Sequence, residues 1–478
     1  MKSMLHKNFA FLSASSLLSP VFSMVLVLAI SRLQGVEVLG KYSLMMTVFV
    51  LGQNCAALGL PIVITREVAQ AHHNAGRYFI SACLLTMTIV LLAVVGAIGG
   101  LRWAMSDVEL RWALELVLLS LLPSVVTAYG EAVLLAFERA GDFVALNLLE
   151  NTLRAAVGTC LVFLGGGIVS LAVAVLVLRV LTSAAFIVAL RRRGVALSMQ
   201  VDGRLCRTLL RYMPVLGSIP IVNAIYARAD IFLLTWFGTW ADVGLYSAGL
   251  RLVDVTRSIP PAYARALYPI LSRLRASAPD EFRAVSQRSI RNILMLVVPI
   301  ALLLSGLAKP VILLLYGPQL AEAAASLRVL AWALVPVALA TTLAQMLFAA
   351  DKQAIDLRVN LLATVVSVAA GMLLVPFWGA VGAAVAVLIS SSVYAALQYR
   401  FVCQMVTDVA ARRLMTTLAT IAASSALLML LVENAHPILT GIVGLAAYAV
   451  GLTLAGLITR SDLDRVRVSL GGFSTAIR

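Results

Sequence analysis

The chain has few charged residues. Asp, Glu, Lys and Arg make up 12% of its 478 residues, and hydrophobic residues make up 62%. A soluble domain has about a quarter charged residues and about half apolar ones. The mean hydropathy of +0.99 therefore excludes a soluble protein. The sequence predicts an all-α, polytopic membrane protein.

Cysteine and histidine are also scarce. The five cysteines have no paired spacing, and the four histidines lie at the edges of apolar runs without a ligand pattern. Disulfide frameworks and metal sites need clustered side chains of these types. We therefore expect no structural disulfide, no metal site and no cofactor.

Long segments between the apolar runs are missing as well. The longest, around 191–211 and 269–289, have about twenty residues, too few for a catalytic domain outside the membrane. The sequence has no P-loop, nucleophile elbow or His-Glu-x-x-His signature. We assign no catalytic residues and expect a transporter rather than an enzyme.

What the chain does have is about fourteen apolar runs. A membrane-spanning helix needs about 20 apolar residues. We place the spans near 9–31, 38–62, 78–101, 110–135, 143–164, 168–190, 212–236, 243–268, 290–308, 326–349, 358–376, 379–399, 413–432 and 437–458.

Two sets of residues recur along the chain. The tetrad 40–43, Gly-Lys-Tyr-Ser, returns 204 positions later as Gly-Leu-Tyr-Ser at 244–247. A second set returns 213 positions later: Pro123, Glu138, Asn147 and Gly166 match Pro336, Asp351, Asn360 and Gly379. Such self-similarity indicates an internal repeat.

The repeat predicts the domain organisation. An even number of spans separates the copies, so both have the same orientation in the membrane, with a cavity between them. We expect two pseudo-symmetric six-helix lobes around a central cavity, plus two C-terminal helices. The predicted parts are an N-lobe (1–190), a basic cytoplasmic linker (191–211), a C-lobe (212–401), and spans 13 and 14 with a cytoplasmic tail (402–478).

The net charge of +15 indicates topology. With the N-terminus inside, about 25 Lys and Arg fall in cytoplasmic loops and tails and five fall outside. Cationic loops are retained on the cytoplasmic side, so both termini are expected to be cytoplasmic. We expect the basic linker to contact anionic lipid head groups rather than nucleic acid.

The span 243–268 carries a polar stripe. At about 100° per residue, its charged and hydroxyl side chains fall within an arc of about 120°. Charges that face lipid cost several kcal/mol each, so the stripe should line the cavity. Neighbouring spans add further arginines. The candidate substrate-binding residues are Arg251, Asp254, Arg257, Arg265, Arg228, Arg154 and Arg179.

Arginine suits a phosphate-bearing cargo, because its planar fork makes bidentate bonds to phosphate and stays ionised when partly desolvated. For any single arginine, a structural ion pair is the alternative. Arg251 and Arg257 flank Asp254 by three residues on either side, and Arg154 follows Glu150 by four.

Three acids within the predicted spans are candidates for coupling transport to a proton or sodium ion: Asp230, Glu131 and Glu150. Each could instead be a salt-bridge partner. Arg228 and Asp230 project about 200° apart on a helix, so we expect them to have different partners.

Several motifs resemble one known family. They are Arg228-Ala-Asp230, Val243-Gly-Leu-Tyr-Ser-Ala-Gly249, Pro269-Ile-Leu-Ser272, Leu58-Gly-Leu-Pro61 with Arg66-Glu67, Tyr316-Gly-Pro318 and Pro376-Phe-Trp-Gly379 with Gly382-Ala-Ala384. In these the chain resembles the bacterial oligosaccharide flippases of the multidrug, oligosaccharidyl-lipid and polysaccharide exporter superfamily.

The resemblance implies a function and a location. It implies translocation of undecaprenyl-pyrophosphate-linked oligosaccharide repeat units across the bacterial inner membrane by alternating access. The products would be O-antigen, capsule or exopolysaccharide. Membrane lipids and the polysaccharide polymerase or ligase machinery are the other partners it implies.

Three alternatives stay open. A lipid II flippase shares the span number and a cationic cavity, but the first helix here has no charge before Arg32. A multidrug or cation antiporter of the same superfamily should have a carboxylate in that helix, and 9–31 has none. A non-transporting membrane scaffold or polymerase partner would leave the repeat and the cationic stripe unexplained. For a transporter we expect the lobes to rock, eased by a helix bend at Pro260-Pro261.

Overall fold

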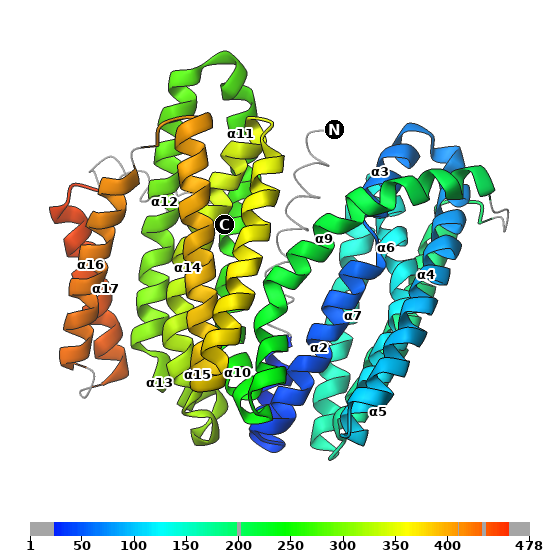
Figure 1. The fold of residues 1–478 in the computed structure, drawn as a ribbon, viewed down its shortest axis with the longest axis horizontal. Coiled ribbons are helices and arrows are strands. Elements are labelled where there is room, and N and C mark those ends of the chain that lie inside the picture. The colour runs from blue at the N-terminus through cyan, green and yellow to red at the C-terminus, as the bar shows by residue number, and fades with distance from the viewer. Residues whose placement is uncertain (1–22, 198–201, 410, 433–435, 458–478) are drawn as a thin grey trace, which may run out of the picture.

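The computed structural model describes residues 23–197, 202–409, 411–432 and 436–457, and the regular elements in these ranges are helices (Figure 1). The first is a short apolar helix over Ser23–Leu33. The others are α2 (Val36–Ala56), α3 (Leu60–Gln70), η1 (His72–Asn74), α4 (Ala75–Ala104), α5 (Val108–Leu119), α6 (Leu121–Ala136), α7 (Ala140–Phe163), α8 (Ile168–Arg192), α9 (Gly203–Phe237), α10 (Trp240–Arg257), α11 (Ile259–Ser277), α12 (Pro279–Gly306), α13 (Ala308–Tyr316), η2 (Pro318–Leu320), α14 (Ala323–Ala349), α15 (Gln353–Met405), α16 (Ala411–Val432) and α17 (Pro437–Leu454).

The helices confirm a polytopic, all-α membrane fold. In the described ranges, nine helices are long and apolar enough to cross a membrane, and the bent pair α2–α3 makes a tenth span. The 53-residue α15 contains two predicted spans, separated by a kink at Gly379 (φ 49°). Two more predicted spans correspond to α7 and to α10 with α11, which carry several charged residues. The predicted span 9–31 and the C-terminal tail lie largely outside the described residues.

The internal repeat is visible in the backbone. Glu138 and Asp351 both take the left-handed conformation, with φ of 58° and 56°, which few non-glycine residues adopt. In each copy the next residue donates its backbone N–H to the carbonyl five positions earlier, at 2.9 Å in the first lobe and 2.8 Å in the second. The two helices that carry the repeated prolines, α6 and α14, thus end in the same turn.

The lobes touch at the end where α2 and α10 begin. Gly40 and Gly244 are the repeated glycines, and they lie at the crossing of these helices. A Cβ on Gly40 would collide with the carbonyl of Trp240, and one on Gly244 with the carbonyl of Val36. Only residues without a side chain permit this backbone contact.

The apolar cores follow the same arrangement. One cluster of buried residues runs without interruption from α2 and α5 into α10, α12 and α14, and so joins the lobes at this closed end. A second cluster, built on α3, α4 and α6, fills the other end of the N-lobe; among the described residues from α9 onward it includes only ones from the first half of α9. The lobes therefore diverge away from the closed end (Figure 1).

One long helix, α9, passes from lobe to lobe. Leu209 and Met213 near its start belong to the N-lobe core, whereas Ile231 and Leu234 belong to the joint core. The helix begins at Gly203, so the second half of the segment assigned to the linker is helical and packs on the N-lobe. Figure 1 shows α9 crossing between the two groups of helices.

Both lobes break their second helix near its middle. The α10–α11 break falls at Ser258, two residues before Pro260, close to the position where the sequence predicts a bend. The α2–α3 break, a 44° bend, was not predicted, since the sequence suggested one span over 38–62. Leu58 and Gly59 have φ of 48° and 70° there. A Cβ on Gly59 would collide with the backbone of Leu216 in α9.

The last two helices form a separate pair on the C-lobe (Figure 1). Met429 of α16 packs against Gly306 of α12 and Gly444 of α17. A Cβ on Gly306 would lie 2.3 Å from the Met429 methyl carbon, and one on Gly444 would lie 2.3 Å from its sulfur. The pair packs against α12, away from the N-lobe.

Candidate functional site

A cavity of about 530 Å³ lies between the lobes. The first helix, α2 and α7 form its N-lobe wall, and α9 and α10 form its C-lobe wall. It begins beside Tyr42 and Ser247, close to the Gly40–Gly244 contact, and extends along both helices as far as Gln53 and Ser258. The lining thus reaches the break at Ser258 on the C-lobe side and stops about one turn before the α2–α3 break on the N-lobe side.

Local sequence fixes where α10 begins. Thr239 and Asp242 form a capping box, in which the Asp242 carboxylate accepts from the Thr239 N–H at 2.9 Å and the Asp242 N–H donates to the Thr239 hydroxyl at 3.2 Å. Such a box satisfies the first free donors of a helix. With the start fixed, Ser247, Arg251 and Asp254 lie on one face, as predicted, and line the cavity together with Arg257 and Ser258.

Asp254 is the acid of this wall. Its carboxylate lies 3.5 Å from Arg228 of α9 and 3.7 Å from Arg257 one turn along α10. Asp230 instead accepts a hydrogen bond from Tyr246 and one from the Ile231 N–H at 2.8 Å. The expectation that Arg228 and Asp230 have different partners is confirmed.

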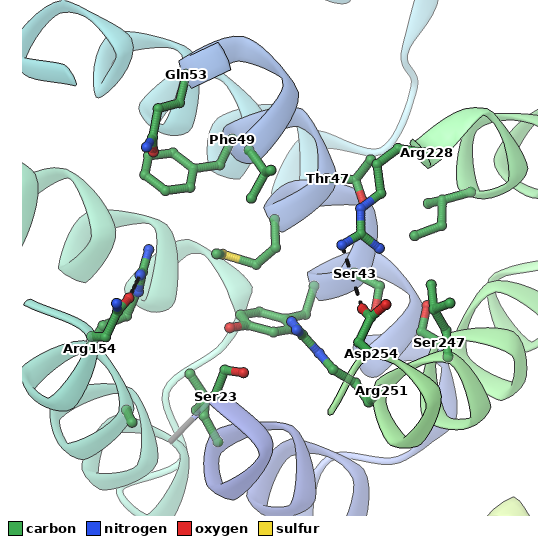
Figure 2. Close-up of a pocket in the computed structure, with 18 of the residues that line it drawn as sticks. Ser23, Ser43, Thr47, Phe49, Gln53, Arg154, Arg228, Ser247, Arg251 and Asp254 are labelled. Atoms are coloured by element: carbon green, nitrogen blue, oxygen red, sulfur yellow. Dashed lines mark hydrogen bonds and ion pairs between the residues drawn. The ribbon is translucent and has the colours of Figure 1, made fainter. Parts of the chain in front are cut away.

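Arg251 differs from its neighbours. Among the described residues, no carboxylate oxygen lies within 4.0 Å of its guanidinium group, although Asp254 is three positions away. Nearby, the Ser247 hydroxyl and the Arg257 Nε are buried without a hydrogen-bond partner. Buried polar groups are normally satisfied, so these groups are available to a ligand that accepts hydrogen bonds. Figure 2 shows Arg251, Asp254 and Ser247 together on the α10 side.

The N-lobe wall contributes Arg154 from α7. Its Nη1 lies 4.0 Å from the Glu150 carboxylate, so the predicted pairing at four residues is present but long. Arg179 and Glu150 pair with each other at 2.7 Å and are 4% and 5% exposed. Neither lines the cavity. The structure thus groups Arg154, Arg228, Arg251 and Arg257 around the cavity and separates Arg179 from them.

The remaining candidates lie elsewhere. Glu131 accepts a hydrogen bond from Asn147 at 2.8 Å, and neither residue lines the cavity. Arg265 belongs to α11, beyond the helix break, and its side chain is outside the described part of the structure. Within the described ranges, no group of three or more His, Cys, Asp or Glu could hold a metal ion.

The polar wall of α2 was missed. Tyr42, Ser43, Thr47, Phe49 and Gln53 line the cavity, and none of them is among the candidate substrate-binding residues named from the sequence. The signal was in the repeat. The residues 204 positions before Ser247, Arg251 and Arg257 of α10 are Ser43, Thr47 and Gln53. The duplicated helix therefore predicts the same face with neutral residues.

The cavity has a strong excess of positive charge. Four arginines and one aspartate are the ionisable acids and strong bases among its described lining residues. Guanidinium groups facing a partly enclosed space in a membrane need anionic partners. The arrangement can bind a polyanionic group, such as a phosphate or diphosphate, between the lobes.

Solved membrane transporters share this fold. An inward closed structure of the lipid II flippase MurJ aligns with a TM-score of 0.76 and 13% identity, over 92% of this chain and 98% of that one. An inward-facing multidrug resistance MATE family transporter of the MOP superfamily aligns with a TM-score of 0.65 and 16% identity, over 82% and 97%. A MOP superfamily transporter from Pyrococcus furiosus gives 0.62 and 16%, over 83% and 95%.

No curated protein sequence matches the chain. A family model described as "Polysaccharide biosynthesis protein" matches residues 27–325. This segment runs from within the first described helix to the start of α14 and contains the described cavity-lining residues except Ser23 and Leu26. Since it covers more than half of the chain, the protein belongs to the polysaccharide biosynthesis protein family.

Proposed function

We propose that the protein is a flippase for undecaprenyl-pyrophosphate-linked oligosaccharide repeat units. It carries them from the cytoplasmic to the periplasmic leaflet of the bacterial inner membrane, where they are used for O-antigen, capsule or exopolysaccharide. The family supports a role in polysaccharide biosynthesis. The fold, shared with transporters of the MOP superfamily, supports transport by alternating access.

The observation that carries the cargo assignment is the charge of the cavity. Arg154, Arg228, Arg251 and Arg257 face one carboxylate, Asp254. A diphosphate brings about two negative charges and several acceptor oxygens, which guanidinium groups bind by paired hydrogen bonds. A cationic drug would meet repulsion in this cavity.

The distribution of surface charge supports an orientation. Exposed arginines gather at the end opposite the Gly40–Gly244 contact, near the ends of α8, α11 and α15 and the starts of α9, α12 and α16. They are Arg191, Arg192, Arg193, Arg204, Arg207, Arg273, Arg283, Arg288, Arg400, Arg412 and Arg413. By the positive-inside rule this end is cytoplasmic. The lobes are then closed toward the periplasm, and the cavity receives cargo from the cytoplasmic leaflet.

We assign the candidate residues as follows. The four cavity arginines and Asp254 bind the diphosphate, and Arg265 stays a substrate-binding candidate from the sequence alone. Arg179 and Glu150 hold α7 to α8. Asp230 and Glu131 are the acids available to couple transport to an ion. The polymerase or ligase machinery would take the translocated unit on the periplasmic side.

Lipid II transport is the second candidate, favoured by the alignment with MurJ over 92% of this chain. Lipid II carries the same kind of diphosphate on a polyprenyl chain, so the cavity arginines serve it equally well. Rescue of a strain depleted of its lipid II flippase would favour this function. Failure to rescue, with loss of surface glycan on deletion, would favour the repeat-unit flippase.

The deciding experiment is gene deletion with complementation. We would measure surface polysaccharide and undecaprenyl-pyrophosphate-linked intermediates in strains carrying wild type, Arg251→Gln or the control Arg288→Gln, an exposed arginine of α12. The proposal is supported if only wild type and Arg288→Gln restore surface polysaccharide. The deletion strain and the Arg251→Gln strain should then hold lipid-linked units in the cytoplasmic leaflet. Unchanged polysaccharide in the deletion strain would refute it.

A further inference from the structure

Arg154 has a distinct position among the cavity cations. It is the arginine that the described part of the N-lobe contributes to the lining, while Arg228, Arg251 and Arg257 come from α9 and α10. Figure 2 shows it across the cavity from Arg228 and Asp254. An anion held by both groups would therefore connect the two lobes.

Phe49 of α2 lies beside this arginine. The Cζ atom of Arg154 is 5.6 Å from the centre of the Phe49 ring, and that of Arg179 is 5.4 Å from it. Both distances are within the range of about 6 Å for an attraction between a cation and an aromatic ring. The Phe49 side chain is 2% exposed, so the ring is fixed by packing.

The nearest acid is committed elsewhere. Glu150 pairs with Arg179 at 2.7 Å, and Arg179 also donates to the Ser124 hydroxyl at 2.8 Å. The distance from Glu150 to Arg154 is 4.0 Å. Arg154 also donates to Asn151, a neutral acceptor. Its contacts orient the guanidinium group but leave most of its charge uncompensated.

We propose that Phe49 is a positioning residue that holds Arg154 toward the cavity, as the N-lobe half of an anion site completed by the C-lobe arginines. This inference rests on the proposed function, because it takes the diphosphate as the anion. A ring stabilises a guanidinium group without neutralising it. A carboxylate at position 49 would instead compete with the ligand.

The test is a double-mutant cycle on the full-length protein in lipid nanodiscs, with inorganic pyrophosphate as the probe and calorimetry as the readout. Arg154→Gln should weaken binding about tenfold, and Phe49→Leu about fivefold. If Phe49 acts through Arg154, Phe49→Leu causes no further loss in the Arg154→Gln background, because coupled residues are not additive. Phe49→Tyr keeps the ring and should retain the affinity.

Two controls separate positioning from packing. Val253→Ala changes the repeat counterpart of Phe49, which is fully buried in the other lobe. It should lower the melting temperature and leave pyrophosphate affinity unchanged. Melting temperatures of all variants show whether each is folded.

The outcomes are distinct. The role of Phe49 would be overturned if Phe49→Leu lowers pyrophosphate affinity equally in the wild-type and Arg154→Gln backgrounds, or if it leaves the affinity unchanged. Either result would leave the proposed flippase function standing. Loss of affinity in Phe49→Tyr as large as in Phe49→Leu would overturn it too. The proposed cargo fails, and this inference with it, if wild type does not bind pyrophosphate and Arg251→Gln restores surface polysaccharide in the deletion strain as well as wild type does.

Discussion

Alanine at position 244 should open the closed end of the molecule. A Cβ on Gly244 would collide with the Val36 carbonyl oxygen and lie 2.8 Å from Val36 Cγ2. The oxygen belongs to the backbone, so a rotamer change cannot relieve the clash, and α2 and α10 must move apart. Overpacking of this kind costs about 1–3 kcal/mol. The cost falls only on the conformation in which the two helices touch.

This cost translates into a shift between conformations. Since 1.4 kcal/mol is about a tenfold change in an equilibrium constant, we expect the ratio of open to closed molecules at this end to rise about fivefold to 150-fold. A ligand or substitution shifts such an equilibrium only by its differential effect on the two states. Gly244→Ala destabilises the closed conformation and not the open one, so it acts directly on this equilibrium.

Distance measurements between spin labels would test the shift. Trp103 at the end of α4 and Phe377 at the kink of α15 are 93% and 79% exposed and lie in different lobes at the closed end. Labels placed there, in a background without the five native cysteines, should show a new population at longer distance. The control is Gly99→Ala, where a Cβ would meet nothing within 4 Å. The reasoning is refuted if both variants give the wild-type distribution.

Two further substitutions test ion pairs of the N-lobe. Glu150→Gln leaves the guanidinium group of Arg179 buried without its partner at 2.7 Å. This should destabilise the protein by about 3–5 kcal/mol and lower the melting temperature in detergent; an unchanged value would contradict a structural role for the pair. At the turn before α5, a hydrogen bond from Lys41 lowers the pKa of Asp107 below its usual range. A carboxyl whose folded-state pKa is depressed stabilises the fold above about pH 4 and loses that contribution as the pH falls. Asp107→Asn should therefore reduce the loss of stability on acidification by about 0.5 kcal/mol, measured by melting at stepped pH, and a pH profile identical to wild type would count against this pair.

Much of the fold could be predicted because its signals are local or repeated. Apolar runs mark the spans, and Glu138 and Asp351 mark the same turn in both lobes. The α2–α3 break was harder to predict. Gly59 and Pro61 are visible in the sequence, but the close approach of the α9 backbone to Gly59 is a tertiary contact.

The site was predicted in part for the same reason. The α10 stripe follows from the helical period alone, so its residues were found. Arg179 was placed with the cavity arginines because nothing near it in sequence explains a charge in an apolar helix. Its partner Glu150 lies 29 positions earlier on another helix. Helical periodicity does not identify partners across helices.

The repeat compares the charged cavity face of α10 with the neutral face of α2. The 204-residue offset pairs Thr47 with Arg251 and Gln53 with Arg257. The copies thus share a glycine contact and a broken helix but differ in charge. At an effective dielectric constant of about 20, two unit charges about 8 Å apart repel by about 2 kcal/mol. Arginines on both helices would therefore oppose closure of α2 against α10. The N-lobe cation comes instead from α7, away from this crossing, so the lobes can close while the cavity keeps positive charge on both sides.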